Sequence, residues 1–259
     1  MREQRLLGGR TAGAVRVGET IHKPTQRWTP GVQAVLDHLE GVGFEGAPRA
    51  LGVDDQGRQV LSYLVGETVG EQRPWPDWVR SDTALVQVGA WLRRLHDATA
   101  SFVPPEDTAW FAGQSWRPGL VIGHHDAAPY NVVWRGERLV GFVDWDIAGP
   151  SSPELDLAFV ALTWVPMQAR RVAAEQGFVA FDDRSRRLHL LLDAYRYDGD
   201  RAAFGAAIAG RARVNAAGID RLAGGGDPMY VGLLSVVTDL EEAAREVEAL
   251  PPSFWVTRG

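Results

Sequence analysis

Four polar side chains have the types and the spacing needed for phosphoryl transfer from a nucleotide. His124, Asp126 and Asn131 lie in the segment Gly123-His-His-Asp-Ala-Ala-Pro-Tyr-Asn131, and Asp144 follows a short apolar stretch. Such a transfer needs a carboxylate that orients the acceptor hydroxyl and takes its proton, and oxygen ligands that hold Mg²⁺ on the phosphates. Asp126 suits the first role. The amide oxygen of Asn131 and the carboxylate of Asp144 suit the second.

The spacing of these residues is informative because the chain has only six His and two Asn. A chance match has a probability on the order of a few in a thousand. The alternative is a plain loop in which Asp126 caps a turn and Asn131 adopts a turn conformation. A zinc site on His124 and His125 is disfavoured, because adjacent side chains diverge and no further His or Cys lies at a ligand spacing. We expect His124 to brace the loop by hydrogen bonds, with direct catalysis as the alternative.

The composition excludes several classes of protein. With 45% hydrophobic and 23% charged residues among 259, the chain is typical of a globular protein. The absence of cysteine excludes disulfides, a thiolate nucleophile and Cys-ligated zinc. A formal net charge of −6 argues against a nucleic-acid partner, which needs basic surface. No run of about 18 apolar residues and no signal-peptide pattern occurs, so we expect no membrane partner and a cytoplasmic location.

Residues up to about 66 are expected to form a small, mostly β unit with one helix. Glycine-rich turns and β-type residues indicate the strands, and Pro30 suits the first turn of the helix. The expected strands cover residues 14–17, 20–23, 49–53 and 59–65, and the helix covers residues 30–41. We therefore place a nucleotide-binding lobe at residues 1–66 and a catalytic and substrate-binding lobe at residues 67–259.

The second lobe is expected to be mostly helical, with one hairpin that positions Asp144. Residues 131–134 and 138–143 are typical of antiparallel strands that turn near Gly136. The open end of that hairpin brings Asp144 back beside Asp126 and Asn131. The fold class expected is therefore α+β. Apolar residues at helical spacing predict helices over residues 82–98, 155–164, 184–195, 201–222 and 229–250.

The stretch from Val121 to Pro166 resembles the aminoglycoside phosphotransferase family, small-molecule kinases related in fold to protein kinases. The family's H-x-D-x4-N loop is matched by His124, Asp126 and Asn131, and its metal-binding Asp is matched by Asp144. The resemblance implies a two-lobed protein-kinase-like fold. It also implies that Asp126 is the catalytic base and that Asn131 and Asp144 are magnesium ligands.

A later motif of the family, D-L-A, is matched by Asp156-Leu157-Ala158 at the start of an expected helix. In the family this Asp is usually a buried structural anchor. The resemblance therefore implies that Asp156, like His124, supports the catalytic loop and does not bind the metal.

The resemblance is looser in the first lobe. Gly8, Gly9 and Gly13 occupy the position of the family's nucleotide loop, where backbone amides cover the phosphates; the alternative is a simple hairpin turn. Lys23, the only lysine in the chain, lies near the family's basic residue that pairs with the α- and β-phosphates. The alternative for Lys23 is an exposed cation at a strand end. Ser62-Tyr-Leu64 resembles the linker between lobes, where backbone groups hydrogen-bond the base.

One departure from the family concerns the partner of Lys23. Kinases usually pair this lysine with a Glu on the next helix, whereas the matching region here has Val32 and Gln33, and Glu40 lies near the helix end. We expect either that Gln33 takes that place by hydrogen bonding, or that Lys23 is held only by the nucleotide and another carboxylate. Asp146 suits three roles equally well: metal support, contact with a substrate amine, or an exposed loop position.

These features predict an ATP-dependent kinase that uses Mg²⁺ and phosphorylates a hydroxyl of a small molecule, such as an aminoglycoside or a similar cationic compound. Antibiotic resistance would then be a role, and GTP is not excluded as donor. The alternative is a non-catalytic nucleotide-binding regulatory protein that retains the fold. A protein kinase is disfavoured, because only about ten residues separate Asp144 from Asp156, too few for a long activation segment. The sequence leaves the acceptor and the oligomeric state open.

Overall fold

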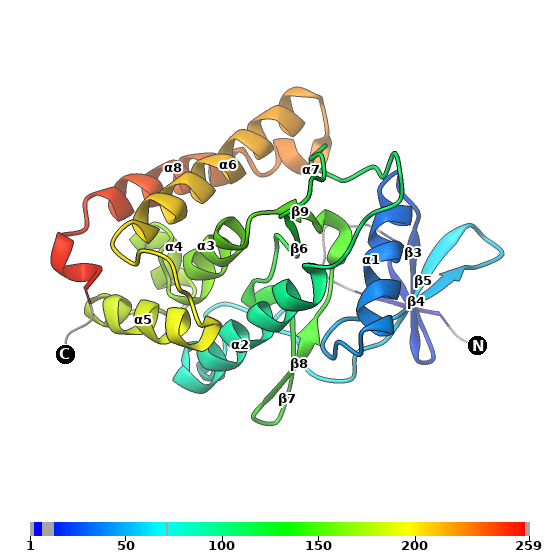
Figure 1. Cartoon of the computed structure of the whole chain (residues 1–259), viewed down its shortest axis with the longest axis horizontal. Coiled ribbons are helices and arrows are strands. Elements are labelled where there is room, and N and C mark those ends of the chain that lie inside the picture. Colours follow the sequence, from blue (N-terminus) through cyan, green and yellow to red (C-terminus); the bar gives the residue numbers. More distant parts are fainter. Residues whose placement is uncertain (1–2, 7–12, 71, 257–259) are drawn as a thin grey trace. The chain divides into compact units, whose positions relative to one another are not determined.

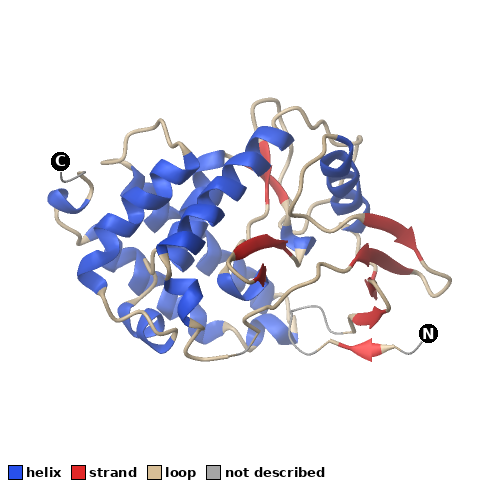
Figure 2. Cartoon of the chain, turned by 90° about the horizontal axis from the view of Figure 1, so that it is seen from below, coloured by secondary structure: helices blue, strands red, loops and turns tan. Residues whose placement is uncertain are grey.

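The computed structural model describes residues 3–6, 13–70 and 72–256 (Figure 1). The chain forms two compact units that alternate along the sequence. The first unit contains the residues up to 71 and Trp91–Pro153, and the second contains Gln72–Ala90 and the residues from 154 onward. All of the described strands belong to the first unit, whereas helices dominate the second (Figure 2). The lobe boundary expected near residue 66 stays a prediction.

The first unit is built on a five-stranded antiparallel sheet in the order β1-β2-β3-β5-β4. The expected hairpin before Lys23 and the later strand pair are both present, and β5 ends at Ser62 instead of continuing to Val65. This sheet and the helix beside it confirm the expected α+β class. The strands are β1 (Gln4–Arg5), β2 (Val15–Val17), β3 (Thr20–Pro24), β4 (Ala50–Val53) and β5 (Arg58–Ser62).

The turn between β4 and β5 is held by the carboxylate of Asp54. This side chain accepts hydrogen bonds from the backbone N–H groups of Gln56 and Arg58, both at 2.9 Å, and from Nδ1 of His22 at 2.7 Å. The hydrogen bond from His22, followed by those from Arg58 and Gln56, holds the pKa of Asp54 well below its usual range. These bonds join β3 to the turn, and the same register pairs Lys23 with Gln59.

Helix α1 (Thr29–Gly41) follows β3 and carries an apolar face. Val32, Val35, Leu36 and Leu39 recur at three- and four-residue spacing, and each is at most 1% exposed. A proline in the first turn needs no N–H partner there, which agrees with the predicted start of the helix.

Two short strand pairs bring the loop that contains Asp126 and Asn131 close to Asp144. Strand β6 (Val121–Gly123) pairs antiparallel with β9 (Gly149–Ser151), and β7 (Val132–Arg135) pairs antiparallel with β8 (Arg138–Phe142), which confirms the expected hairpin. The loop between β6 and β7 ends in a short 3₁₀ turn, and the loop between β8 and β9 begins at residue 143. These loops meet because the N–H of Val143 donates to the carbonyl of Asn131 at 2.9 Å.

Two glycines let the loop after α1 lie directly against β8. A Cβ added at Gly141 would lie 2.4 Å from the carbonyl oxygen of Gly46, so only glycine fits at position 141 without a backbone shift. The same carbonyl accepts hydrogen bonds from the N–H of Phe142 and from Nε1 of Trp91, both at 3.1 Å. This contact holds in place the strand that leads to Asp144.

The second unit contains a buried helix and several amphipathic ones. Every residue of α3 from Asp156 to Trp164 is buried, which explains its lack of a polar face. In Figure 1, α6 and α8 run side by side, and they pack along each other. The helices are α2 (Asp82–Thr99), whose last part belongs to the first unit, α3 (Pro153–Trp164), α4 (Arg170–Glu175), α5 (Arg184–Tyr195), α6 (Phe204–Gly224), α7 (Pro228–Val231) and α8 (Leu234–Glu248).

The single helix expected over residues 229–250 is instead two helices. Asp227 caps α7 by accepting a hydrogen bond from the N–H of Met229 at 3.0 Å, and Gly232 follows α7 directly. Glycine is a weak helix former, so an apolar pattern that crosses it overstates the length of the helix. None of the described helices is both long and apolar enough to span a lipid bilayer.

Candidate active site

Both oxygens of the Asp126 carboxylate accept hydrogen bonds from the loop that follows β6. Nδ2 of Asn131 donates to Oδ2 at 2.8 Å and to the backbone carbonyl of Asp126 at 3.0 Å, and the hydroxyl of Tyr130 donates to Oδ1 at 2.6 Å. Asp126 and Asn131 are only 5% and 6% exposed. Hydrogen bonds to a buried carboxylate are strong and directional, so the charge is held in one orientation.

These contacts also orient the amide of Asn131. Because its NH₂ group binds Asp126, its carbonyl oxygen points away from that carboxylate. Asn131 also lines the cavity that contains Asp144 and Lys23. An amide oxygen is a suitable ligand for a hard cation.

His124 joins the loop to the end of β8. Its Nδ1 accepts a hydrogen bond from the N–H of Asp126 at 3.3 Å, so Nε2 carries the proton and donates to the carbonyl of Val143 at 3.1 Å. The imidazole is fully buried among Trp145 and Phe142, with ring centroids 4.7 and 5.8 Å away. A neutral ring with both nitrogens bonded to backbone suits support of the loop better than proton transfer.

Asp144 follows β8 in a left-handed backbone conformation, with φ 62° and ψ 63°. This conformation costs a non-glycine residue roughly 1–2 kcal/mol, although Asp tolerates it better than most. Nε1 of Trp145 donates to the carbonyl of Phe142 at 2.9 Å and closes the turn around it. Asp144 is still partly open to solvent, with 21% of its side chain exposed. The left-handed turn thus leaves the carboxylate accessible at the cavity.

Lys23 is buried, at 6% exposed, and pairs with two carboxylates. Its Nζ lies 2.6 Å from Oδ1 of Asp146 and 3.4 Å from Oδ1 of Asp144. Gln33 does not take the place of the missing helix Glu, because its amide donates to the carbonyl of Gly52 at 3.2 Å. Of the alternatives left by the sequence, the structure shows another carboxylate as partner, and that carboxylate is Asp146. An exposed strand-end cation is not what the structure shows.

Sequence reasoning missed Tyr130 and did not assign Asp146. The signal for Asp146 was present, since an acid two residues after Asp144 is a natural partner for the only lysine of the chain. The signal for Tyr130 was weaker. A tyrosine four residues after Asp126 is within reach of it in a loop that folds back, but nothing in the composition distinguishes it from a packing residue.

A cavity of about 260 Å³ is lined by part of this group of residues and by residues of the sheet of the first unit. Its polar end carries Lys23, Asn131 and Asp144, and most of the rest of its wall is apolar. Ser62 and Leu64, both expected to contact the base, lie on it. The remaining lining residues are Leu6, Ala14, Ile21, Pro48, Leu61, Tyr63, Gly66, Thr68, Gly70, Tyr130, Val133 and Val143.

The other residues proposed from the sequence are not among those that line this cavity. Gly13 has φ +101°, in the turn that precedes β2, and its neighbour Ala14 lines the cavity. Gly8 and Gly9 lie outside the described residues. Asp156 is fully buried in the first turn of α3, in the second unit. Its supporting role stays a prediction.

The donor set at the polar end fits Mg²⁺. It consists of oxygen atoms from one amide and one carboxylate, and Mg²⁺ in nucleotide sites is held by one or two carboxylates together with phosphates and water. Within residues 3–6, 13–70 and 72–256, no group of three His, Cys, Asp or Glu side chains is placed to hold a metal by itself.

Comparison with known proteins agrees with this geometry. A model of the phosphotransferase enzyme family (APH) matches residues 109–190, a range that includes Asp126, Asn131, Asp144 and Asp156. The trifolitoxin immunity protein of Rhizobium leguminosarum bv. trifolii is 38% identical to this chain over 195 residues, which cover 73% of this chain and 72% of that protein.

Solved structures with the same fold are small-molecule kinases. A choline/ethanolamine kinase family protein from Mesorhizobium loti is 19% identical, with a TM-score of 0.62 over 98% of this chain and 91% of that one. Amicoumacin kinase, solved with AMP-PNP and Ca²⁺, is 11% identical, with a TM-score of 0.62 over 97% and 91%. The GDP complex of aminoglycoside 2′-phosphotransferase-IIIa is 15% identical, with a TM-score of 0.53 over 95% and 93%. These similarities confirm the expected kinase-like fold. The chain belongs to the aminoglycoside phosphotransferase (APH) family of phosphotransferase enzymes.

Proposed function

We propose that this protein is a magnesium-dependent kinase that transfers the γ-phosphoryl group of ATP to a hydroxyl of a small molecule. One observation carries the proposal: Lys23, Asn131 and Asp144 meet at the polar end of an otherwise largely apolar cavity. Asp126 is hydrogen-bonded to two residues of that cavity wall, Asn131 and Tyr130. The residues proposed to bind the base, the phosphates, the metal and the acceptor would thus be adjacent.

The purine would lie between apolar walls of the cavity. The N–H groups of Ser62 and Tyr63 already donate to the carbonyls of Arg49 and Glu19, at 3.0 and 2.9 Å. The polar edge of the base would therefore be read mainly by the backbone of Leu64 and by carbonyls of the linker. Backbone reading is compatible with adenine and with guanine. Relatives solved with AMP-PNP and with GDP leave both donors open, and we favour ATP.

The polar end would hold the phosphates. The ammonium of Lys23 would bind the α- and β-phosphates as a compact positive charge. Its ion pairs with Asp146 and Asp144, which hold it at the polar end of the cavity, support this role. Asn131 and Asp144 would hold Mg²⁺, which when bound supplies neutralisation of the charge on the transferring group. Gly8, Gly9 and Gly13 would cover the phosphates by their amides.

Asp126 would orient the acceptor hydroxyl and accept its proton. Each carboxylate oxygen has two lone pairs, so Asp126 retains acceptor capacity beside its bonds to Tyr130 and Asn131. The transition state of phosphoryl transfer is loose, which makes the position of the acceptor more important than early deprotonation. His124 would keep the loop in register with β8, and Asp156 would anchor the helix that follows.

Replacement of Tyr130 by phenylalanine tests the orientation of Asp126. The change keeps the ring in the cavity wall and removes only the hydroxyl that binds Oδ1. Loss of a hydrogen bond to a charged group costs about 1.5–3 kcal/mol, so we expect kcat to fall by roughly tenfold or more while KM for ATP stays the same. The matched control is Tyr197→Phe, which removes a hydroxyl that binds the carboxylate of Glu154 outside the cavity. An unchanged kcat in Tyr130→Phe would show that the Tyr130 hydroxyl does not orient Asp126 for catalysis.

A coupled ADP-release screen tests the function itself. Purified protein with ATP and Mg²⁺ would be tested against aminoglycosides, other antibiotics and hydroxyl-bearing metabolites, with Asp126→Ala as the blank. We expect ADP release that depends on one class of acceptor and on Mg²⁺. ATP binding without turnover for any acceptor would contradict the proposal.

A second candidate is a non-catalytic protein that protects by binding. It is favoured by the relative named for immunity to trifolitoxin and by the missing helix Glu. Protection from a toxin is compatible with phosphorylation of the toxin and with its sequestration. The two differ in a cell-survival assay, because Asp126→Ala should abolish protection by phosphorylation and leave protection by sequestration intact.

A further inference from the structure

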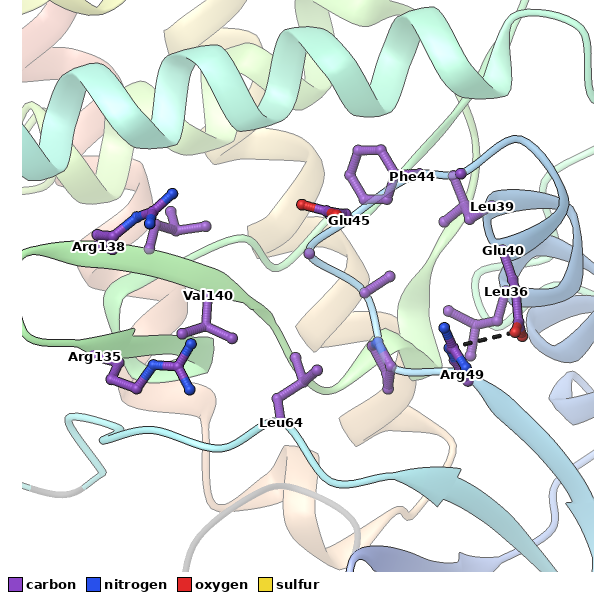
Figure 3. Close-up of a pocket in the computed structure, with 15 residues that line it drawn as sticks. Leu36, Leu39, Glu40, Phe44, Glu45, Arg49, Leu64, Arg135, Arg138 and Val140 are labelled. Carbon is purple, nitrogen blue, oxygen red and sulfur yellow. Dashed lines mark ion pairs between the residues drawn. The ribbon is translucent and has the colours of Figure 1, made fainter.

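A second and larger cavity, of about 610 Å³, lies in the first unit between the end of α1, the loop after it and the β7–β8 hairpin (Figure 3). None of Lys23, Asp126, Asn131 and Asp144 lines it. Pro48 and Leu64 line both this cavity and the smaller one, so the two cavities are neighbours. The volume is within the range of small-molecule sites, about 300–1,000 Å³.

Part of the wall of this cavity is apolar. Leu36 and Leu39, each 1% exposed, come from α1, and Phe44 comes from the loop that follows. Leu139 and Val140 come from β8. An apolar ligand body of modest size would find contacts on two sides of this cavity.

One end of the cavity carries two unneutralised positive charges. Arg135 and Arg138 lie directly opposite each other across the hairpin, and both are exposed. Neither side chain makes a hydrogen bond or an ion pair with another residue of the described ranges, whereas Arg49, at the other end in Figure 3, lies 3.3 Å from Glu40. Like charges directly opposite in an antiparallel pair are destabilising. An anion between them would relieve this repulsion.

Glu45 restricts the kind of anion. Its exposed carboxylate also lines the cavity and is drawn toward the arginine end in Figure 3. A ligand with two negative charges would meet repulsion there, whereas a singly charged group would be attracted by two guanidinium groups and opposed by one carboxylate. A cationic compound would be repelled by the arginines.

We propose that this cavity binds an amphipathic monoanion, with its carboxylate between Arg135 and Arg138 and its apolar body against Leu36, Phe44 and Val140. Arginine forms bidentate bonds with carboxylates, and the apolar walls would remove the ligand body from water. The site is separate from the nucleotide cavity and from Asp126. It goes beyond the proposed kinase activity, because no step of phosphoryl transfer uses these residues.

Calorimetric titration of the full chain with octanoate tests this site. Saturating AMP-PNP and Mg²⁺ would be present, so that the nucleotide cavity is occupied. We expect one equivalent of octanoate to bind, no binding of octylammonium, and at least about tenfold weaker binding of octanoate to the double variant Arg135→Ser/Arg138→Ser. The matched control is Arg94→Ser/Arg117→Ser, two exposed arginines of the same unit outside the cavity, which should bind as the wild type does.

A second variant tests the apolar half of the site. Val140→Phe narrows the cavity and leaves both arginines in place, so it should weaken octanoate binding while AMP-PNP still binds. The proposal would be overturned by absence of octanoate binding to the wild type, or by unchanged affinity in both variants. Equal loss in the Arg94/Arg117 control would also overturn it, because the binding would then follow net charge. Thermal unfolding midpoints within a few degrees of the wild type would show that the variants fold.

Discussion

Replacing Asp126 with alanine is expected to lower kcat by about 100- to 10,000-fold, the range that a general base contributes, while the affinity for ATP stays within about twofold. Asp126 does not line the cavity proposed for the nucleotide, but it is hydrogen-bonded to Tyr130 and Asn131, which do. Its removal would therefore affect the acceptor more than the nucleotide. This split between turnover and binding distinguishes a catalytic carboxylate from a structural turn residue.

The measurement is ADP release with the acceptor found in the screen, together with ATP binding by titration. Asp126→Ala leaves two donors without their acceptor, so circular dichroism is needed to show that the loop change has not unfolded the protein. Asp37→Ala, on the exposed face of α1, is the matched control and should behave as the wild type. A fully active Asp126→Ala variant would show that the alternative of a plain loop is correct.

Replacing Asp144 with asparagine is expected to make ATP binding independent of Mg²⁺ and to lower kcat by roughly 100-fold or more. The substitution keeps the size of the side chain and tolerates the left-handed backbone, but it removes the charge that would hold the metal. Wild-type protein should bind ATP more tightly when Mg²⁺ is added. The variant should show little change.

The comparison variant is Asp146→Asn. Asp146 contacts Lys23 at 2.6 Å, whereas Asp144 lies 3.4 Å from it. Comparison of the two variants therefore distinguishes a residue that positions the lysine from one that would bind the metal. Asp146→Asn should weaken ATP binding at every Mg²⁺ concentration and keep its dependence on Mg²⁺. If both variants retained that dependence, Asp144 would not be a metal ligand.

The arrangement of the loop from Asp126 to Asn131 could be predicted from the sequence because its geometry is local. The spacing from Asp126 to Asn131 and the return of the hairpin to Asp144 follow from strand direction and turn chemistry, without knowledge of the rest of the fold. The buried face of α1 could be predicted equally well, since it follows from helical periodicity. Assignment of the chemical roles still depends on the experiments above.

The partner of Lys23 could not be predicted, because it is a long-range contact. Asp146 is 123 positions away along the chain (146 − 23), and only the packing of the sheet against the β8–β9 loop decides which acid is closest. The split between α7 and α8 was missed because an apolar stripe continues across Gly232. The cavity at Arg135 and Arg138 could not be predicted either, since two arginines at strand ends give no sign of an apolar surface nearby.

Because the chain has a single lysine, and that lysine is buried, one side chain can be modified selectively. Apart from the α-amino group, Lys23 is the only primary amine in the chain, and it is 6% exposed and ion-paired. An acylating reagent carried on a nucleotide would thus modify one side chain, and its yield, read by mass spectrometry, would report occupancy of the cavity without knowledge of the acceptor. A general amine reagent at a fixed dose would provide a protection assay. Any ligand that enters the cavity would lower the extent to which Lys23 is modified.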